Sequence, residues 1–568
     1  MKSIFSLSLG LIVPAILCVA TGVVTAASEV DEKQGEALQS NVTFENRYGV
    51  QGGLNVNDFI TAAEQGDIAE VKKMLAAGID VNSSREDGQT ALIRASRGHI
   101  DVVQLLINSG ANVNQGDVKN ITPLMHAVYM KQPEIVKLLI SNGADVNIFC
   151  TDEGTSAIYD AAYVGCVESA KLLIANGAKL NYQEKIIGAT PLVRASMSGH
   201  AEVVQELIKA GADLHLRAKF NNTALTCAAQ YGHVEVIKAL IRSGANLEDK
   251  RDDGYTPLII ASVYEKKEAV KFLVDNGADI NAVANHGESA VIACVVHKKN
   301  RILETLIECG ADLEAKDSGG WFAMMYAAKV NNIKAIEMLA AAGADVDKTN
   351  DEKFTPLMEA VSKGNAAAVN ALVKYGANVN HTRPDGCTVL MYAANGGNRA
   401  ITDVLIANGA EVNAASNEGW TALMYACQAG KLGVVNALID AGANVNTKNK
   451  GNKDALQIAK HNKHEDVVKK LKKAGAKEIV KAKPKKKIKK NSGTPSNIKT
   501  NSGGQCQLCK GSGRFDGGKC MSCMGSGRHT VCEYCKGRKS HDIPCYPCGD
   551  SGINNFSIIL KVGPFADK

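Results

Sequence analysis

Eight of the chain's 16 cysteines stand close together near its C-terminal end, in four C-x-x-C pairs. A C-x-x-C turn directs two thiolates to one point, and two such turns complete a tetrahedral four-sulfur zinc site with Zn–S bonds of about 2.3 Å. The residues between the pairs are mostly Gly, Ser, Lys and Arg, so this segment lacks the apolar side chains for a core of its own. The spacing therefore predicts two zinc ions. Their ligands are Cys506, Cys509, Cys520, Cys523, Cys532, Cys535, Cys545 and Cys548.

The same thiols also allow a second interpretation, namely four disulfides or a thiol–disulfide exchange centre. Seven further cysteines are spread over residues 150–427, several of them at positions where a small residue packs between helices. These predict buried free thiols, which are unusual in an oxidising compartment. The upstream thiols and the glycine-rich spacing favour zinc, whereas an export signal at the N-terminus favours disulfides.

A repeat of about 33 residues fills the middle of the chain. Glycines in strings such as NGAD recur thirteen times, at spacings of 32, 33, 34 and 34 residues and then eight times at 33. They are Gly78, Gly110, Gly143, Gly177, Gly211, Gly244, Gly277, Gly310, Gly343, Gly376, Gly409, Gly442 and Gly475. A unit this short cannot bury its own apolar faces, so the copies must stack on one another.

Residues 251–283 illustrate one unit. The string DDGYTP is a turn in which Thr256 suits a helix N-cap and Pro257 the first helical position. The string KEAVKFLVDNG forms a second amphipathic helix, and Gly277 suits a left-handed residue at its end. Each unit is predicted to be a hairpin loop followed by two short antiparallel helices.

These units resemble the ankyrin repeat family. The resemblance rests on Thr-Pro-Leu or Thr-Ala-Leu in seven units, on Gly-His in three and on closing GADVN or GANVN strings, and it covers residues 57–481. It implies an all-α solenoid of thirteen ankyrin repeats with hairpin loops, which binds a protein partner on its concave face and is not an enzyme. Met or Ile mostly replaces the family's usual histidine after Thr-Pro-Leu, so we expect packing to hold the loops.

Aromatic residues gather at the variable positions of repeats seven to twelve, on the hairpin loops and the first helices. They are Tyr255, Trp321, Tyr326, Phe354, Tyr392, Trp420 and Tyr425, which include both tryptophans of the chain. The first-helix position in earlier repeats instead holds Arg94, His126, Asp160 and Arg194. Because aromatic residues are enriched in binding hot spots, the seven rings predict a partner-binding track. The alternative is that they pack locally between neighbouring loops.

The cysteine segment resembles the central cysteine-rich domain of DnaJ-type co-chaperones. The strings CQLCKGSG and CMSCMGSG match its C-x-x-C-x-G-x-G pattern fully, whereas the third and fourth pairs each keep one of the two glycines. The resemblance implies a small zinc-stabilised module over residues 506–552, with the outer two pairs on one ion and the inner two on the other. The chain shows no J domain, so a structural or second interaction site is expected. The alternative is a chaperone-like holdase or thiol exchanger.

The segments around the repeats have their own compositions. Residues 1–27 predict a signal peptide, because Lys2 precedes an apolar run that ends in small residues; an uncleaved anchor is the alternative. A spacer follows over 28–56, and we expect an exported protein, periplasmic or secreted. Residues 469–490 carry 12 Lys and one Glu, a net +11, so with +6 for the whole chain the remainder carries −5.

Residues 482–505 are accordingly predicted to be a basic flexible linker, followed by the cysteine module and a tail over 553–568. The linker's charge favours an anionic surface such as a membrane, and a solvated spacer is the alternative. Aromatic residues are not interleaved with its lysines, so specific nucleic-acid readout is not expected. The scattered His, Asp and Glu residues show no catalytic spacing. We therefore expect a monomeric, non-enzymatic binding protein.

We expect two zinc ions per chain and eight thiols that become reactive when a chelator removes the metal, because four C-x-x-C turns supply two four-sulfur sites. Metal analysis combined with thiol titration, with and without reductant, measures both quantities. A metal-free protein with four disulfides or readily cycling thiols would instead support thiol exchange.

Overall fold

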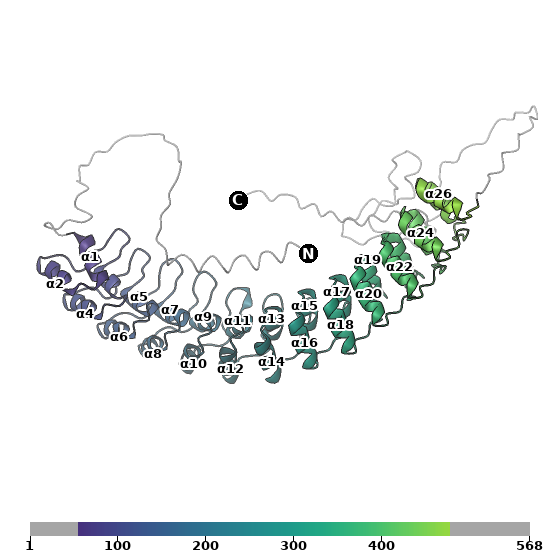
Figure 1. Ribbon diagram of the computed structural model, residues 1–568. Helices are drawn as coiled ribbons and strands as arrows, with labels where there is room; N and C mark the ends of the chain where they lie inside the picture. Colours follow the sequence, from purple (N-terminus) through teal and green to yellow (C-terminus); the bar gives the residue numbers. More distant parts are fainter. Residues whose placement is uncertain (1–54, 478–568) are drawn as a thin grey trace, which may run out of the picture. The chain divides into compact units, whose positions relative to one another are not determined.

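The computed structural model describes residues 55–477, which form a single row of helix pairs in chain order (Figure 1). This part of the chain contains the 26 α-helices α1 to α26 and one short 3₁₀ turn (Lys219–Asn221). It contains no extended strand, only seven isolated β-bridges within the hairpin loops. The predicted signal peptide, the linker, all eight cysteines of the C-x-x-C pairs and the tail lie outside the described residues.

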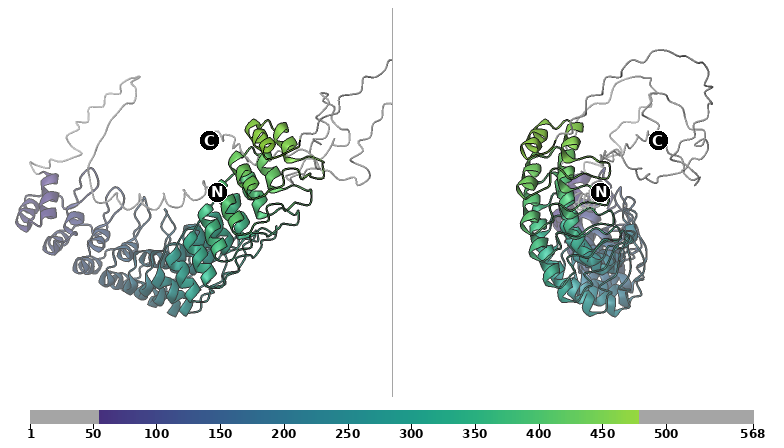
Figure 2. Two further views of the ribbon diagram at one scale, coloured as in Figure 1. Left: turned by 45° about the vertical axis from the view of Figure 1, so that its right-hand side comes forward. Right: turned by 90° about the vertical axis from the view of Figure 1, so that its right-hand side faces the viewer.

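Consecutive helices pair into thirteen units, which we number one to thirteen. The right-hand view in Figure 2 shows the two helices of the later units, coloured teal to green, as two parallel columns. The first helices are α1 (Val56–Gln65), α3 (Ala91–Ala95), α5 (Pro123–Tyr129), α7 (Ala157–Val164), α9 (Pro191–Ser198), α11 (Ala224–Tyr231), α13 (Pro257–Val263), α15 (Ala290–Val296), α17 (Ala323–Lys329), α19 (Pro356–Ser362), α21 (Val389–Gly396), α23 (Ala422–Gln428) and α25 (Ala455–His461).

The second helices follow each first helix after a tight turn. They are α2 (Ile68–Ala76), α4 (Ile100–Asn108), α6 (Pro133–Ser141), α8 (Val167–Ala175), α10 (Ala201–Lys209), α12 (Val234–Arg242), α14 (Lys267–Asp275), α16 (Asn300–Glu308), α18 (Ile333–Ala341), α20 (Ala366–Lys374), α22 (Arg399–Ala407), α24 (Leu432–Asp440) and α26 (Glu465–Lys473). In Figure 1 the odd-numbered helices from α5 to α19 line the inner side of the curved row, and the even-numbered ones line its outer side.

The predicted unit over residues 251–283 is confirmed in its parts. Thr256 is the N-cap of α13, where its Oγ1 accepts a hydrogen bond from the Ile259 N–H, and Pro257 is the first helical residue. A cap of this kind contributes about 1 kcal/mol. Gly277 ends the second helix with φ +90°, yet no atom lies within 4 Å of where a Cβ would stand. The backbone conformation, rather than space, therefore requires glycine there.

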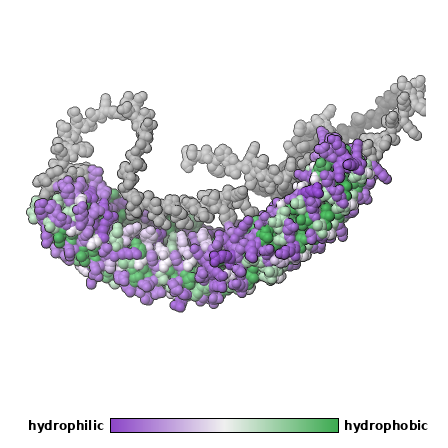
Figure 3. Space-filling model, in the orientation of Figure 1, coloured by the Kyte–Doolittle hydropathy of each residue, from purple (hydrophilic) through white to green (hydrophobic). Residues whose placement is uncertain are grey.

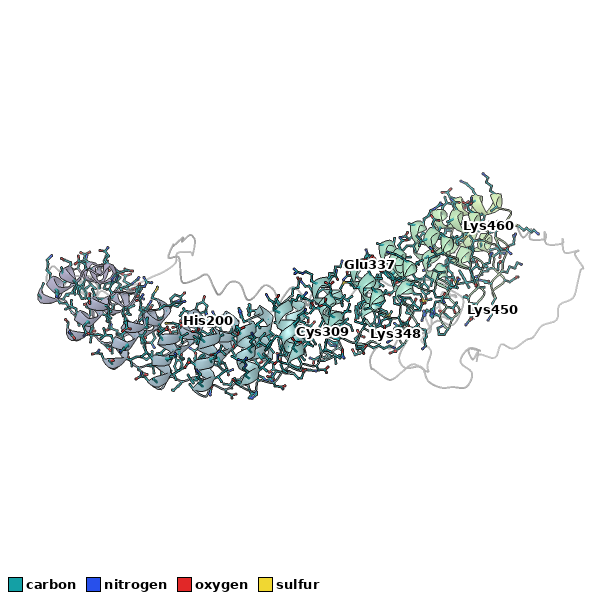
Figure 4. All side chains as sticks on the ribbon, turned by 60° about the horizontal axis from the view of Figure 1, so that its bottom comes forward. His200, Cys309, Glu337, Lys348, Lys450 and Lys460 are labelled. Carbon is teal, nitrogen blue, oxygen red and sulfur yellow. The ribbon has the colours of Figure 1, made fainter. Side chains whose placement is uncertain are left out.

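In several units, a side chain at the turn between the two helices bonds to the unit before it. His200, labelled in Figure 4, donates from Nε2 to the Tyr163 carbonyl at 3.0 Å, and His233 donates to the Met197 carbonyl at 3.0 Å. In later repeats an asparagine takes over, as where Asn365 Nδ2 donates to the Lys329 carbonyl at 3.0 Å. These bonds satisfy carbonyls at the C-terminal ends of the preceding first helices.

A ladder of side-chain hydrogen bonds joins the loops that follow the second helices. At eleven of the twelve junctions, the side chain ending one loop accepts a bond of 2.7–3.0 Å from a backbone N–H of the next loop. The acceptors are Asn82, Asn114, Asn147, Asn181, Glu248, Asn281, Glu314, Asp347, Asn380, Asn413 and Asn446. His215 occupies this position between repeats five and six, where the described residues show no such bond.

The hairpin loops form a second ladder through their backbones. At nine junctions an N–H of one hairpin donates to a carbonyl of the preceding hairpin, for example from Lys450 (labelled in Figure 4) to Glu418 at 3.0 Å. Within the described chain this bond is missing on both sides of repeat ten, and on one side Pro384 has no N–H to donate. The expectation that packing holds the loops is therefore wrong for most junctions, because hydrogen bonds join them.

Residues 55–477 contain neither a candidate membrane span nor a candidate metal site. No helix in this range is long and apolar enough to cross a membrane. No group of three or more His, Cys, Asp or Glu side chains in this range is arranged to hold a metal ion. The predicted zinc ligands fall outside the range, so the zinc hypothesis stays a prediction.

The side-chain ladder lacks one hydrogen bond among the described residues, at the junction where His215 stands. His215→Asn supplies the acceptor found at the other junctions, so the Asn246 amide should gain protection from hydrogen exchange, and the array should gain up to about 1 kcal/mol. Asn281→Ala removes an existing rung and should expose the Asp312 amide to exchange. Hydrogen-exchange mass spectrometry measures both changes. If Asn246 exchanges as fast in the variant as in the parent, the side-chain acceptor does not limit this junction.

Candidate protein-binding surface

The inner surface of the array is built from the first helices and the hairpin loops that precede them. All seven aromatic residues predicted from the sequence lie on these elements, in repeats seven and nine to twelve. All seven are half-buried and pack against the continuous core, so each ring keeps part of its surface in solvent. Sequence reasoning placed them correctly on the hairpins and first helices.

Six of the seven rings associate in pairs. Trp321 and Tyr326 of repeat nine lie with ring centroids 5.4 Å apart, and Trp420 and Tyr425 of repeat twelve lie 5.1 Å apart. Phe354 of repeat ten meets Tyr392 of repeat eleven edge to face at 5.3 Å. Tilted and edge-to-face pairs are favourable because of the ring quadrupoles. Local packing between hairpin and helix is therefore part of what these rings do.

Hydrogen bonds fix the tyrosine hydroxyl groups of the track. Tyr255 donates to Glu288 Oε2 at 2.7 Å, and Tyr326 donates to Asp317 Oδ2 at 2.6 Å. Arg383 Nη1 donates to the Tyr392 hydroxyl at 2.8 Å. Burial, together with the bond to Asp317, raises the pKa of Tyr326, so this phenol stays protonated at neutral pH. The rings thus have fixed positions before any partner arrives.

Cations from the same repeats cover part of the track. Lys329 Nζ lies 4.5 Å from the centroid of Trp321 and 5.5 Å from that of Tyr326. The Arg383 guanidinium carbon lies 5.4 Å from the Phe354 centroid. Contacts of this kind contribute about 0.5–1 kcal/mol at exposed sites. The indole face of Trp321 is therefore already engaged by a cation of its own repeat.

The most exposed apolar residues lie elsewhere, and sequence reasoning missed them. Phe220 on the hairpin of repeat six is 69% exposed and Val118 on that of repeat three is 64% exposed. Ile186 on the hairpin of repeat five and Tyr129 at the end of α5 are also exposed. The repeat pattern could have predicted the exposure of the three hairpin residues, because an apolar side chain at a hairpin tip has no neighbour to cover it. On the face shown in Figure 3 the surface is mostly hydrophilic, with smaller apolar areas between.

The seven cysteines of the repeats are free thiols, and five of them are buried as predicted. Burial raises the pKa of Cys227 and of Cys427 to about 12, so both thiols stay protonated and unreactive at neutral pH. Cys309 (labelled in Figure 4) and Cys387 are only partly buried. The buried thiols therefore act as small core residues.

The match to a protein-family model agrees with this architecture. A family model for ankyrin repeats in sets of three copies matches residues 59–150, 149–218, 192–284, 290–383, 357–449 and 390–483. The crystal structure of the human ASB11 ankyrin repeat domain matches at 27% identity and a TM-score of 0.36, covering 39% of this chain and 98% of that domain. The family model alone accounts for nearly all of the repeat region.

Curated relatives match over three or four repeats. The ankyrin repeat and KH domain-containing protein mask-1 of Caenorhabditis elegans is 38% identical over 108 residues, which are 19% of this chain and 4% of that protein. The putative ankyrin repeat protein YahD of Escherichia coli is 33% identical over 91 residues, 16% of this chain and 45% of YahD. The chain thus spans less than half the length of these relatives. Since the family model covers most of its residues, the chain belongs to the ankyrin repeat family.

Proposed function

We propose that the protein is an exported scaffold that binds a protein partner through the aromatic track of repeats seven to twelve. Ankyrin arrays are typically non-enzymatic scaffolds for protein–protein interaction. The observation that carries the proposal is the set of half-exposed, paired rings on consecutive inner elements, with three of the four tyrosine hydroxyls bonded to charged side chains. Rings fixed before binding lose little entropy when a partner contacts them, which favours affinity.

The track offers both apolar and polar contacts. Trp321 and Trp420 belong to hairpins, whereas Tyr326 and Tyr425 belong to helices, so each pair joins the hairpin of its repeat to the first helix. Lys329, held over Trp321, adds a cation that a partner carboxylate can meet. Large rings at a partly desolvated surface are the residues that dominate binding free energy in protein interfaces.

The proposed function also includes a C-terminal zinc module and export of the protein. The eight C-terminal cysteines hold two zinc ions and form a structural or second interaction module joined to the array by the basic linker. The sequence spacing of the four C-x-x-C pairs supports this, and so does the scarcity of apolar side chains between them. The apolar run after Lys2 supports export.

Replacing both tryptophans of the track should abolish most partner binding. Trp321→Ala combined with Trp420→Ala removes two rings, and a single hot-spot truncation costs about 2 kcal/mol or more, roughly 30-fold in affinity. The measurement is affinity capture on the full chain with isotope-coded quantification, followed by titration of the partner that the parent retains.

Phe220→Ala is the matched control, because it removes an exposed ring from a hairpin outside the track. Partner affinity should be unchanged in this variant. If the double tryptophan variant binds as tightly as the parent while its hydrogen-exchange protection falls around repeats nine and twelve, local packing is the whole role of the rings.

A further inference from the structure

The first two repeats carry a cluster of arginines around a single glutamate. Arg94 Nη1 lies 2.9 Å and Arg97 Nη1 lies 3.2 Å from the same oxygen, Oε1 of Glu64. Arg85 Nη1 lies 3.9 Å from the other oxygen and donates through Nη2 to Thr61 Oγ1 at 2.7 Å. We call these four side chains the Glu64 cluster. Three cations thus surround one carboxylate, which bonds directly to two of them.

The cluster has more positive charge than its carboxylates neutralise. The additional carboxylate nearby is Asp87, which lies 3.8 Å from Arg94 Nη2 and is 54% exposed, so water screens it. The Nε atoms of Arg94 and Arg97 are buried and have no hydrogen-bond partner. Burial first, and then the charges of Arg97 and Arg94, lower the pKa of the adjacent His126 to about 4. His126 is therefore neutral at pH 7 and the local potential is positive.

A second site with little countercharge is Arg194 on α9, three first helices along the array from α3. Arg194 lies with its guanidinium carbon 4.2 Å from the centroid of Tyr163 and 5.8 Å from that of Tyr159. Its Nε is buried and has no hydrogen-bond partner. Burial, with Glu153 adding to it and Arg194 opposing it, raises the pKa of the nearby Asp160 to about 8. The same burial weakens Asp160 as a countercharge for Arg194.

Apolar surface lies between the two basic ends. Tyr129 and Met130 at the end of α5 are each 36% exposed. The Tyr129 ring lies 6.2 Å from that of Tyr163 on α7, so the two helices present neighbouring rings. The first helices α3, α5, α7 and α9 therefore display arginine, tyrosine, tyrosine and arginine in that order. We call this series the Arg–Tyr band.

We propose that the Arg–Tyr band is a second interaction surface, which binds an extended acidic segment of a partner protein with apolar residues between two carboxylates. The excess positive charge at Arg94, Arg97 and Arg194 favours carboxylates of the partner. Tyr129 and Tyr163 contact its apolar side chains. A peptide is favoured over a nucleic acid because the basic groups are few and the two ends are separated by apolar rings. This surface shares no residue with the aromatic track.

The helix spacing sets the pattern of the segment. Packed helices lie about 8–10 Å apart and an extended chain advances about 3.3 Å per residue, so roughly three residues span one repeat. The probe is therefore a fluorescein-labelled peptide of 12 residues with Glu at positions 1 and 10, Phe at positions 4 and 7, and Gly and Ser elsewhere. Matched probes carry Lys in place of Glu, or Ser in place of Phe. A 12-nucleotide oligothymidylate serves as the polyanion probe.

Binding is measured by fluorescence anisotropy with the full chain at low and high salt. The parent should bind the Glu–Phe peptide at least about tenfold more tightly than either matched peptide, with an affinity that falls as salt rises. Arg94→Gln combined with Arg97→Gln should weaken binding about tenfold. Glu64→Gln should instead strengthen it several-fold, because it removes the carboxylate that competes with the ligand. A purely structural role of Glu64 predicts no gain.

Trp321→Ala combined with Trp420→Ala should leave this binding unchanged. The result for the Arg–Tyr band is therefore independent of whether the aromatic track binds a partner. Equal affinity for the Glu and Lys peptides would overturn the proposal, as would a Glu64→Gln variant that stays folded and binds no more tightly than the parent. Tighter binding of the oligothymidylate than of the Glu–Phe peptide would overturn the partner class and assign the band to polyanions.

Discussion

The whole array depends on one constraint: no repeat can bury its own apolar faces. Each helix has only five to ten residues, too few to be stable alone in water, and its apolar side chains reach full burial only between neighbouring repeats. Leu273 on α14 and Leu306 on α16, for example, are both completely buried within one continuous core. Apolar burial therefore supplies the favourable free energy, and it does so across junctions rather than within units.

Polar groups set the register in which the repeats stack. Thr and Ser caps begin most first helices, histidines or asparagines at the turns satisfy carbonyls of the preceding repeat, and two ladders join the loops. Since each contact reaches only the next repeat, a local defect stays local. The missing rung at His215 and the unlinked hairpin of repeat ten are therefore compatible with an intact array.

The inner surface has two chemically different halves on one repeating backbone. The same first-helix position holds Arg94 and Arg194 in early repeats, and Tyr326 and Tyr425 in later ones. In the early half the guanidinium groups outnumber the available carboxylates, whereas in the later half Asp317 and Glu288 accept from phenols. Because the scaffold is uniform, side-chain identity alone determines what each half can bind.

The sequence by itself determined the repeat, its period, the helix pair and the N-cap at Thr256, because short-range backbone preferences and the spacing of apolar residues need no tertiary information. It also located the seven aromatic residues on hairpins and first helices. The tertiary structure decided which rings pair, as Phe354 does with a tyrosine of the next repeat, and which arginines share one carboxylate. The Phe354–Tyr392 pair and the contacts of Arg94 and Arg97 with Glu64 join residues 30 or more positions apart, and only the stacking of neighbouring repeats brings such residues together.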